Sequence, residues 1–221
     1  MIEQIAAREF RQQAGVEDWR VVGDGACTYL RTGSFEAGAR IVQAISELPG
    51  LGPHQPDIDL RHDGVTVRLV ATAADYMGMS TRDVELAREI SRIAREQGLS
   101  PDPSAVESVL LVIDAMDIPA VMRFWRALLD YEVRPDSPDE DLIDRHWRWP
   151  GIWFEQMDVP RPQRNRIHVA VWVPIEQAEA RVAAAIAAGG SLVTDQFAPM
   201  WWVLADPEGN EADVATILNR D

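Results

Sequence analysis

The stretch LGPHQPDIDLRHDGVTVRLVATAA, residues 51–74, decides the fold of the first half of the chain. Within it, Val65, Val67 and Leu69 occupy every second position, which is the pattern of a strand with one buried face. The dipeptide Asp63-Gly64 is typical of a tight hairpin turn. The stretch therefore predicts two strands, near 57–61 and 65–71, joined as a hairpin.

Further elements are predicted on both sides of this hairpin. Strands are expected near 19–22 and 26–31, and helices over 2–14, 35–48 and 81–97. Ser34 and Ser80 are placed to cap the second and third helices, and Asp83 lies in the first turn of the third. The expected class is α+β, with an antiparallel sheet that carries its helices on one face.

The segment REQGLSPDPSAVES, residues 95–108, interrupts the pattern with a glycine and two prolines, which neither a helix nor a central strand tolerates. We expect a first domain over 1–98, a linker over 99–105 and a second domain over 106–221. In the second domain a βαβββ pattern occurs twice. The expected strands are 108–114, 131–134, 142–148, 151–157, 166–173, 191–195, 200–204 and 211–217, and the expected helices are 118–130 and 175–188. The acidic stretch 134–144 is expected to be a solvated loop.

Composition excludes several classes of protein. The net charge is −15, and no cluster of cations is present to bind nucleic acid. All 21 basic residues are arginine, which excludes a Schiff-base lysine. No apolar run approaches the length of a membrane helix, and the charged start, MIEQIAAREFRQQ, does not look like a signal peptide. The single cysteine, Cys27, cannot form an internal disulfide, so we expect a cytoplasmic protein.

Residues 18–97 resemble the pterin-4a-carbinolamine dehydratase family. The resemblance rests on Trp19, on GSFEAGARIVQAI, on the His-x-Pro-Asp-Ile motif before the hairpin and on MGMSTRDVELAREI after it. It implies a lyase that removes water from a 4a-hydroxytetrahydropterin. That reaction needs one group to protonate the leaving hydroxyl and another to take a ring proton. In the family this work falls to a His-His-Pro motif and to a third histidine at the end of the hairpin's second strand.

The resemblance assigns roles residue by residue. His54 matches the first histidine of the His-His-Pro motif, and Pro56 matches its proline. Gln55 replaces the second histidine, and Thr72 falls near the third, so neither position can exchange protons near neutral pH. The implied catalytic residues are His54 as acid and base, Gln55 as an orienting group and Asp83 as support, with Pro56 and Thr72 contacting substrate. A structural loop histidine is the alternative role for His54.

Residues 107–217 resemble the glyoxalase/bleomycin-resistance group, also called vicinal oxygen chelate proteins, through FWRALLDYEV and VLADPEGNEADV. The resemblance implies paired βαβββ modules that curl into a half-barrel cup. It also implies a divalent metal (Zn, Mn, Fe or Ni) held by Glu155, His168 and Asp213. The fourth ligand position is Leu110, which cannot ligate. A metal-free pocket with polar lining is the alternative.

Three functions remain open at this point. The favoured one is a small-molecule lyase of the 4a-hydroxytetrahydrobiopterin dehydratase kind. The second is metal-dependent lyase, isomerase or dioxygenase chemistry in the cup, with an inactive pterin domain. The third is a non-catalytic ligand-binding or assembly protein. In each case the expected partners are a small molecule and a second copy of the chain, since the open edge of the first sheet invites pairing. Neither nucleic acid nor membrane is expected.

Overall fold

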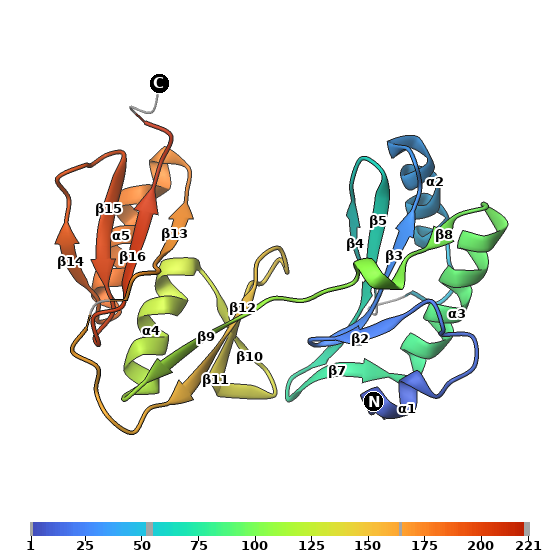
Figure 1. Ribbon diagram of the computed structural model, residues 1–221, viewed down its shortest axis with the longest axis horizontal. Helices are drawn as coiled ribbons and strands as arrows, with labels where there is room; N and C mark the ends of the chain where they lie inside the picture. The colour runs from blue at the N-terminus through green and yellow to red at the C-terminus, as the bar shows by residue number, and fades with distance from the viewer. Residues whose placement is uncertain (1, 52–54, 164, 219–221) are drawn as a thin grey trace. The chain divides into compact units, whose positions relative to one another are not determined.

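The computed structural model describes residues 2–51, 55–163 and 165–218. The chain divides into two compact units, Met1–Val109 and Leu110–Asp221, which Figure 1 shows in blue to green and in green to red. The helices are α1 (Ala7–Arg11), α2 (Phe35–Ser46), α3 (Thr81–Glu96), α4 (Ile118–Leu129) and α5 (Ala178–Ala187), with short 3-10 turns η1 (Pro103–Ala105) and η2 (Ile175–Gln177). The predicted α+β class is confirmed.

Two antiparallel sheets form the first unit. Its strands are β1 (Gln4–Ile5), β2 (Arg20–Val22), β3 (Gly25–Arg31), β4 (Asp57–Leu60), β5 (Gly64–Leu69), β6 (Ala71–Ala73), β7 (Tyr76–Ser80) and β8 (Ser100–Pro101). The larger sheet has the order β2-β3-β5-β4, with β8 also paired to β3, and the smaller has the order β1-β7-β6. The quoted hairpin is present as β4 and β5, and Asp57 pairs with Arg68.

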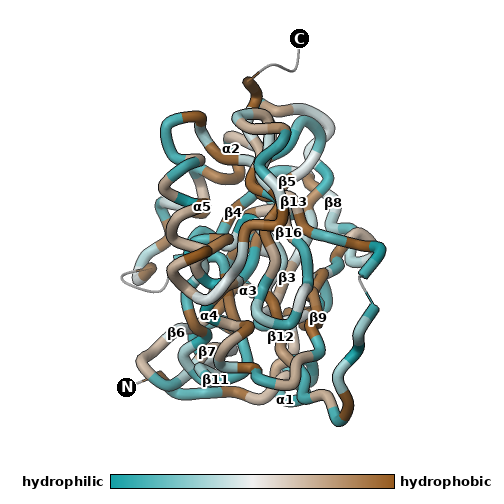
Figure 2. The backbone as a smooth tube through the Cα atoms, turned by 90° about the vertical axis from the view of Figure 1, so that its left-hand side faces the viewer, coloured by the Kyte–Doolittle hydropathy of each residue, from teal (hydrophilic) through white to brown (hydrophobic). Residues whose placement is uncertain are grey.

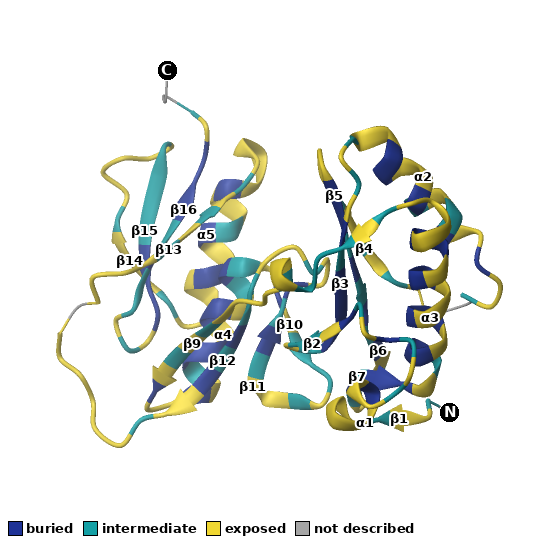
Figure 3. Cartoon of the chain, turned by 45° about the vertical axis from the view of Figure 1, so that its right-hand side comes forward, coloured by how far each residue is buried: buried dark blue, intermediate teal, exposed yellow. Residues whose placement is uncertain are grey.

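Helices α2 and α3 share one hydrophobic core with this sheet, and Figure 3 shows their buried positions along one side of each helix. Ile41 and Ile45 of α2 and Ile90 of α3 are fully buried at the spacing of a helical face. Ser34 caps α2 as predicted, because its hydroxyl accepts the Ala37 N–H at 3.2 Å.

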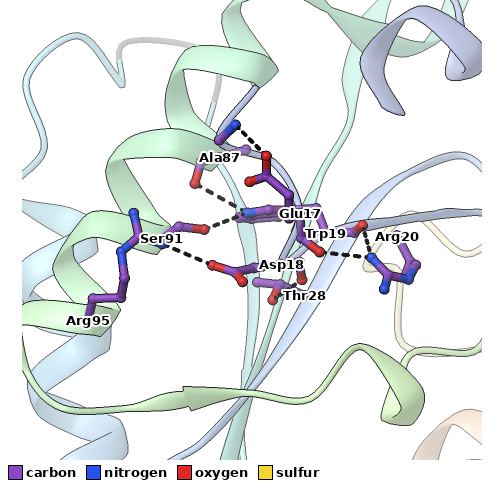
Figure 4. A network of polar contacts seen from close by, with 9 residues as sticks. Glu17, Asp18, Trp19, Arg20, Thr28, Ala87, Ser91 and Arg95 are labelled. Carbon is purple, nitrogen blue, oxygen red and sulfur yellow. Dashed lines mark hydrogen bonds and ion pairs between the residues drawn. The ribbon is translucent and has the colours of Figure 1, made fainter. Parts of the chain in front are cut away.

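Trp19 ties the start of the larger sheet to α3 (Figure 4). Its indole Nε1 donates to the Ser91 hydroxyl at 3.0 Å and to the Ala87 carbonyl at 3.2 Å. The ring is 3% exposed, so both hydrogen bonds are made in a nearly dry environment. The adjacent residue, Asp18, also joins this segment to α3, because its carboxylate forms an ion pair of 3.2 Å with Arg95.

The first unit differs from the sequence prediction in three places. The helix expected over 2–14 is only α1, since Gln4 and Ile5 pair with Ser80 and Met79 of β7 instead. That pairing requires the hairpin β6–β7, which the sequence pattern did not predict. The segment expected as a linker, 99–105, contains β8 and η1 and packs onto β3, where the Asp102 N–H donates to the Tyr29 carbonyl at 2.8 Å.

The second unit contains the two predicted βαβββ repeats. Its strands are β9 (Leu110–Ala115), β10 (Glu132–Arg134), β11 (Ser137–Ile143), β12 (Gly151–Gln156), β13 (Val169–Trp172), β14 (Ser191–Thr194), β15 (Trp201–Ala205) and β16 (Glu211–Ala215). They form two open four-stranded sheets, β10-β11-β12-β9 and β13-β16-β15-β14. In each repeat the first strand pairs in parallel with the last.

One core joins the two repeats of the second unit. It includes Phe124 and Leu128 of α4, Ala185 of α5, and residues from both sheets such as Phe154 and Val214. Figure 2 shows the hydropathy along the chain, including that of β9, whose sequence LLVIDA is mostly apolar. The other face of each sheet, turned away from this core, is called the outer face below.

Most of the acidic stretch 134–144 is a strand rather than the expected loop. Residues Ser137–Ile143 form β11, which lies between β10 and β12. Only Leu142 of this strand is buried, so no apolar alternation is present that a sequence pattern could reveal. Separately, no helix within the described residues is long and apolar enough to cross a membrane.

Candidate functional site

The residues expected to bind a pterin come from separate segments of the first unit. The start of β4 adjoins the end of β5, and an ion pair of 2.8 Å joins Arg68 Nη2 to Asp57 Oδ2 there. Gln55, just before β4, is exposed, and Pro56 is half-buried. Thr72 is exposed on β6, which follows β5 after one residue. His54 lies outside the described residues.

Asp83 lies in the first turn of α3, the helix that follows the β6–β7 hairpin. Its side chain is fully buried, and its Oδ2 accepts hydrogen bonds from the Ser80 N–H at 2.6 Å and the Ser80 hydroxyl at 2.9 Å. These contacts satisfy donors at the start of α3, where a negative charge also interacts favourably with the helix dipole. Asp83 is therefore a structural support for this end of the unit.

The chemistry that the expected pterin-binding residues can supply is limited by their side-chain types. Gln55 and Thr72 offer hydrogen bonds but do not titrate near neutral pH. Asp83 already uses its carboxylate to cap α3. Acid–base catalysis at this position therefore depends on His54.

The predicted metal ligands lie on the outer faces of the second unit. Glu155 is exposed on β12 beside Asp114 of β9, and Asp213 lies on β16. His168, just before β13, places Nε2 3.1 Å from Asp213 Oδ2. This pair supplies two metal donors. Within the described residues no group of three or more His, Cys, Asp or Glu side chains is placed to hold a metal. The three residues therefore do not fit a resident metal in this arrangement.

A cavity of about 750 Å³ lies in the second unit, beside the edge strand β9 and the start of β13. Its polar lining comes from β9, from the loop before β13 and from the turn before β16. These polar residues are Asp114, Arg161, Gln163, Asn165, Arg166, His168, Glu208, Asn210 and Glu211. Among the three predicted metal ligands, only His168 is a lining residue. This volume is typical of a site for a small organic molecule.

The turn Asp206–Asn210 builds one wall of the cavity, and its sequence alone had not indicated this role. Asp206 is 3% exposed and accepts the indole N–H of Trp125 at 3.0 Å. It also accepts the N–H groups of Glu208 and Asn210, both at 2.9 Å. One buried carboxylate thus fixes both the turn and helix α4. The signal in the sequence was DPEGN, whose aspartate and glycine are typical of such turns.

Glu208 ties this turn to the first repeat. Its carboxylate accepts the N–H of Met116 at 2.8 Å and the N–H of Asp117 at 2.6 Å. Both donors precede α4, so the wall of the cavity is anchored to the loop between β9 and that helix. The cavity is consequently shaped by both repeats of the unit.

Comparison with known families agrees with the division of the chain into two units. A family described as pterin 4 alpha carbinolamine dehydratase matches residues 3–93, and one described as glyoxalase-like domain matches residues 110–215. A protein of Nocardia farcinica named "Putative pterin-4-alpha-carbinolamine dehydratase" is 36% identical over 78 residues, which are 35% of this chain and 80% of that protein. A Mycobacterium leprae protein of the same name is 33% identical, over 35% of this chain and 81% of its own length.

These matches define a two-domain protein with a pterin-dehydratase fold and a glyoxalase-like fold. The chain belongs to the pterin-4a-carbinolamine dehydratase family, and its second half is a glyoxalase-like domain. Both resemblances found in the sequence are confirmed.

Solved structures of similar fold to the second unit have low TM-scores and low sequence identity to this chain. A glyoxalase/bleomycin resistance protein/dioxygenase family enzyme from Burkholderia phytofirmans is 20% identical, covers 49% of this chain and 97% of its own, and has a TM-score of 0.38. The fosfomycin resistance protein FosX from Listeria monocytogenes, solved with Mn(II) and sulfate, is 12% identical, covers 49% of this chain and 87% of its own, and has a TM-score of 0.40.

Proposed function

We propose that the first unit dehydrates a 4a-hydroxytetrahydropterin. The observation that carries this proposal is the 36% identity to a protein named as a dehydratase, over 80% of that protein's length. In the proposed reaction the C4a–O bond breaks, the hydroxyl leaves as water with an added proton, and a ring nitrogen loses its proton. His54 gives the first proton and accepts the second, so the products are a dihydropterin and water.

The other positions serve binding in this proposal. Gln55 orients the pterin by hydrogen bonds from its amide, and Pro56 and Thr72 line the site. Asp83 holds the start of α3 in place through Ser80. Each missing proton-transfer group costs about 10²–10⁴-fold in rate, so the expected enzyme is slow.

A gain of activity tests this assignment. Gln55→His restores a proton-transfer group beside His54, and we expect it to raise the dehydration rate about tenfold or more. Gln43→His, on the exposed side of α2, is the matched control and should leave the rate unchanged. If Gln55→His binds pterin and folds normally but is no faster than the parent, the assigned role of this position is wrong.

We propose a second function for the glyoxalase-like unit, the binding of a small organic molecule in the cavity beside β9. The supporting observation is the volume of about 750 Å³ with both apolar and polar lining. Val112→Trp would fill this cavity, whereas Val193→Trp, at an equally exposed position on β14, would not. In a thermal-shift screen of small metabolites, a stabilising compound should act on the parent and the Val193→Trp variant but not on Val112→Trp. No stabilising compound, or one that acts on all three, would remove this function.

We further propose a homodimer that forms through the larger sheet of the first unit. Strand β4 is an edge of that sheet, and its outer side has no strand partner within the described residues. Light scattering at high micromolar concentration should give twice the monomer mass of 24.7 kDa. A monomeric mass under these conditions would exclude the dimer.

We propose a cytoplasmic setting on the basis of Cys27. This thiol is free and buried on β3, so the fold depends on no disulfide. Fractionation of the native host should place the protein with cytoplasmic markers, and its recovery outside the cytoplasm would contradict the proposal.

A further inference from the structure

The polar lining of the cavity contains both positively and negatively charged side chains. Arg161 and Arg166 supply two cations, and Asp114 of β9 and Glu211 of β16 supply two carboxylates. A simple anion would be repelled by the carboxylates, and a simple cation by the guanidinium groups. The lining therefore favours a ligand that carries hydrogen-bond donors and acceptors on different edges of one molecule.

Several of these groups are available to a ligand. No ion pair of Arg161, Arg166 or Asp114 occurs within residues 2–51, 55–163 and 165–218. Glu208 differs from them, since its carboxylate is already held by two backbone N–H groups. One carboxylate acceptor and two guanidinium donors thus remain, and the amides of Gln163 and Asn210 lie among the same lining residues.

The apolar part of the lining suits a flat ring. The apolar lining residues include Leu111, Val112 and Ile113 of β9 and Val169 of β13. Trp125 also lines the cavity, and its indole N–H donates to Asp206. An apolar lining with a small number of polar groups is typical of sites that bind a small organic molecule.

We infer that this cavity binds a pterin, meaning a bicyclic ring with a 2-amino-4-oxopyrimidine edge. The inference rests on the proposed function of the cavity as a ligand site. The amino group and the adjacent ring N–H of a pterin would donate to the Asp114 carboxylate, and its carbonyl oxygen would accept from an arginine. The ligand would then belong to the same chemical class as the substrate of the dehydratase family, to which the first unit belongs. The two halves of the chain would thus handle one kind of compound.

Equilibrium dialysis of the full chain against 7,8-dihydrobiopterin tests the inference. Thr72→Arg places a large side chain at the proposed pterin position of the first unit, so binding at that position should be lost. We expect one pterin per chain to remain. Adding Asp114→Asn should weaken that binding roughly ten- to hundred-fold, because a charge-assisted hydrogen bond is lost. The matched control is Asp139→Asn on β11, outside the cavity, and it should have no effect.

Two results would overturn the inference. One is the absence of pterin binding in the Thr72→Arg chain, and the other is binding that Asp114→Asn leaves unchanged. If a different compound still stabilises the parent but not Val112→Trp, the cavity remains a ligand site and only its assignment to pterins fails. If no compound binds there at all, both proposals fail.

Discussion

His168 and Asp213 are in contact in the glyoxalase-like unit, with Nε2 and Oδ2 3.1 Å apart. The imidazole comes from the start of β13 and the carboxylate from β16, which pair in parallel. The histidine side chain is 42% exposed and the aspartate 16%. Two such residues are fewer than the three or four protein ligands of a typical zinc site.

The first prediction follows from this pair. Protein purified without chelator should contain much less than one equivalent of Zn, Mn, Fe or Ni, because Glu155 does not join the pair as a third ligand. Elemental analysis measures this directly, with His168→Ala as the comparison. Metal near one equivalent in the parent, lost in both His168→Ala and Glu155→Gln, would show that the three residues do act as one site.

The second prediction concerns Asp206. This buried carboxylate accepts hydrogen bonds from Trp125, Glu208 and Asn210. Asp206→Ala leaves the indole N–H unpaired in the core and removes the constraint on the turn, so we expect a loss of roughly 3–5 kcal/mol in the unfolding free energy of this unit. Urea denaturation followed by tryptophan fluorescence measures it. Asp195→Ala, in an exposed turn, is the control and should change stability by less than about 0.5 kcal/mol.

The third prediction separates the structural role of Asp83 from a catalytic one. Asp83→Ala removes both hydrogen bonds to Ser80 and should cost about 1–2 kcal/mol of stability. Asp83→Asn keeps an oxygen acceptor and should cost less. If Asp83 acts only by positioning, dehydration by Asp83→Asn should stay within a few-fold of the parent. A rate reduced about a hundredfold in a stable Asp83→Asn protein would instead assign this carboxylate to the chemistry.

The fourth prediction concerns stability at alkaline pH. Burial raises the pKa of Cys27 from 9.0 to about 11, and the side chain is 7% exposed in the folded protein. The folded state therefore holds the thiol proton more tightly than the unfolded state. This contribution is fully present below pH 9 and is lost as pH rises through the folded pKa near 11, by about 3 kcal/mol in total. Unfolding free energies of Cys27→Ala should show a shallower decline over this interval. If the unfolding free energy of the parent and of Cys27→Ala falls equally steeply with pH, the Cys27 thiol does not contribute to the decline.

Much of the fold could be predicted because the pattern was local. The hairpin around Asp63-Gly64 and the cap at Ser34 each depend on a few adjacent residues. The strand β1 depends on pairing with β7, 75 residues away, and β11 has a single buried residue. Neither leaves a periodic signal in its own segment, so propensity suggested a helix and a loop.

The site was harder to predict than the fold. Residue types alone indicated that Gln55 and Thr72 cannot transfer protons. The resemblance predicted that Glu155, His168 and Asp213 act together, but the structure brings only His168 and Asp213 into contact. The cavity, however, is built by a loop and a turn that are distant in sequence, through Arg161 and Glu208. Only the three-dimensional structure brings such segments together, because they have no shared periodicity.

The fifth prediction tests the central claim, that the first unit is a dehydratase whose acid–base group is His54. The measurement is the rate of 4a-hydroxytetrahydropterin dehydration by the full chain, compared with the uncatalysed rate. We expect the parent to exceed the background, His54→Ala to fall to it, and His62→Ala, an exposed turn histidine, to match the parent. A parent rate equal to the background, or a His54→Ala chain as fast as the parent, would contradict the claim.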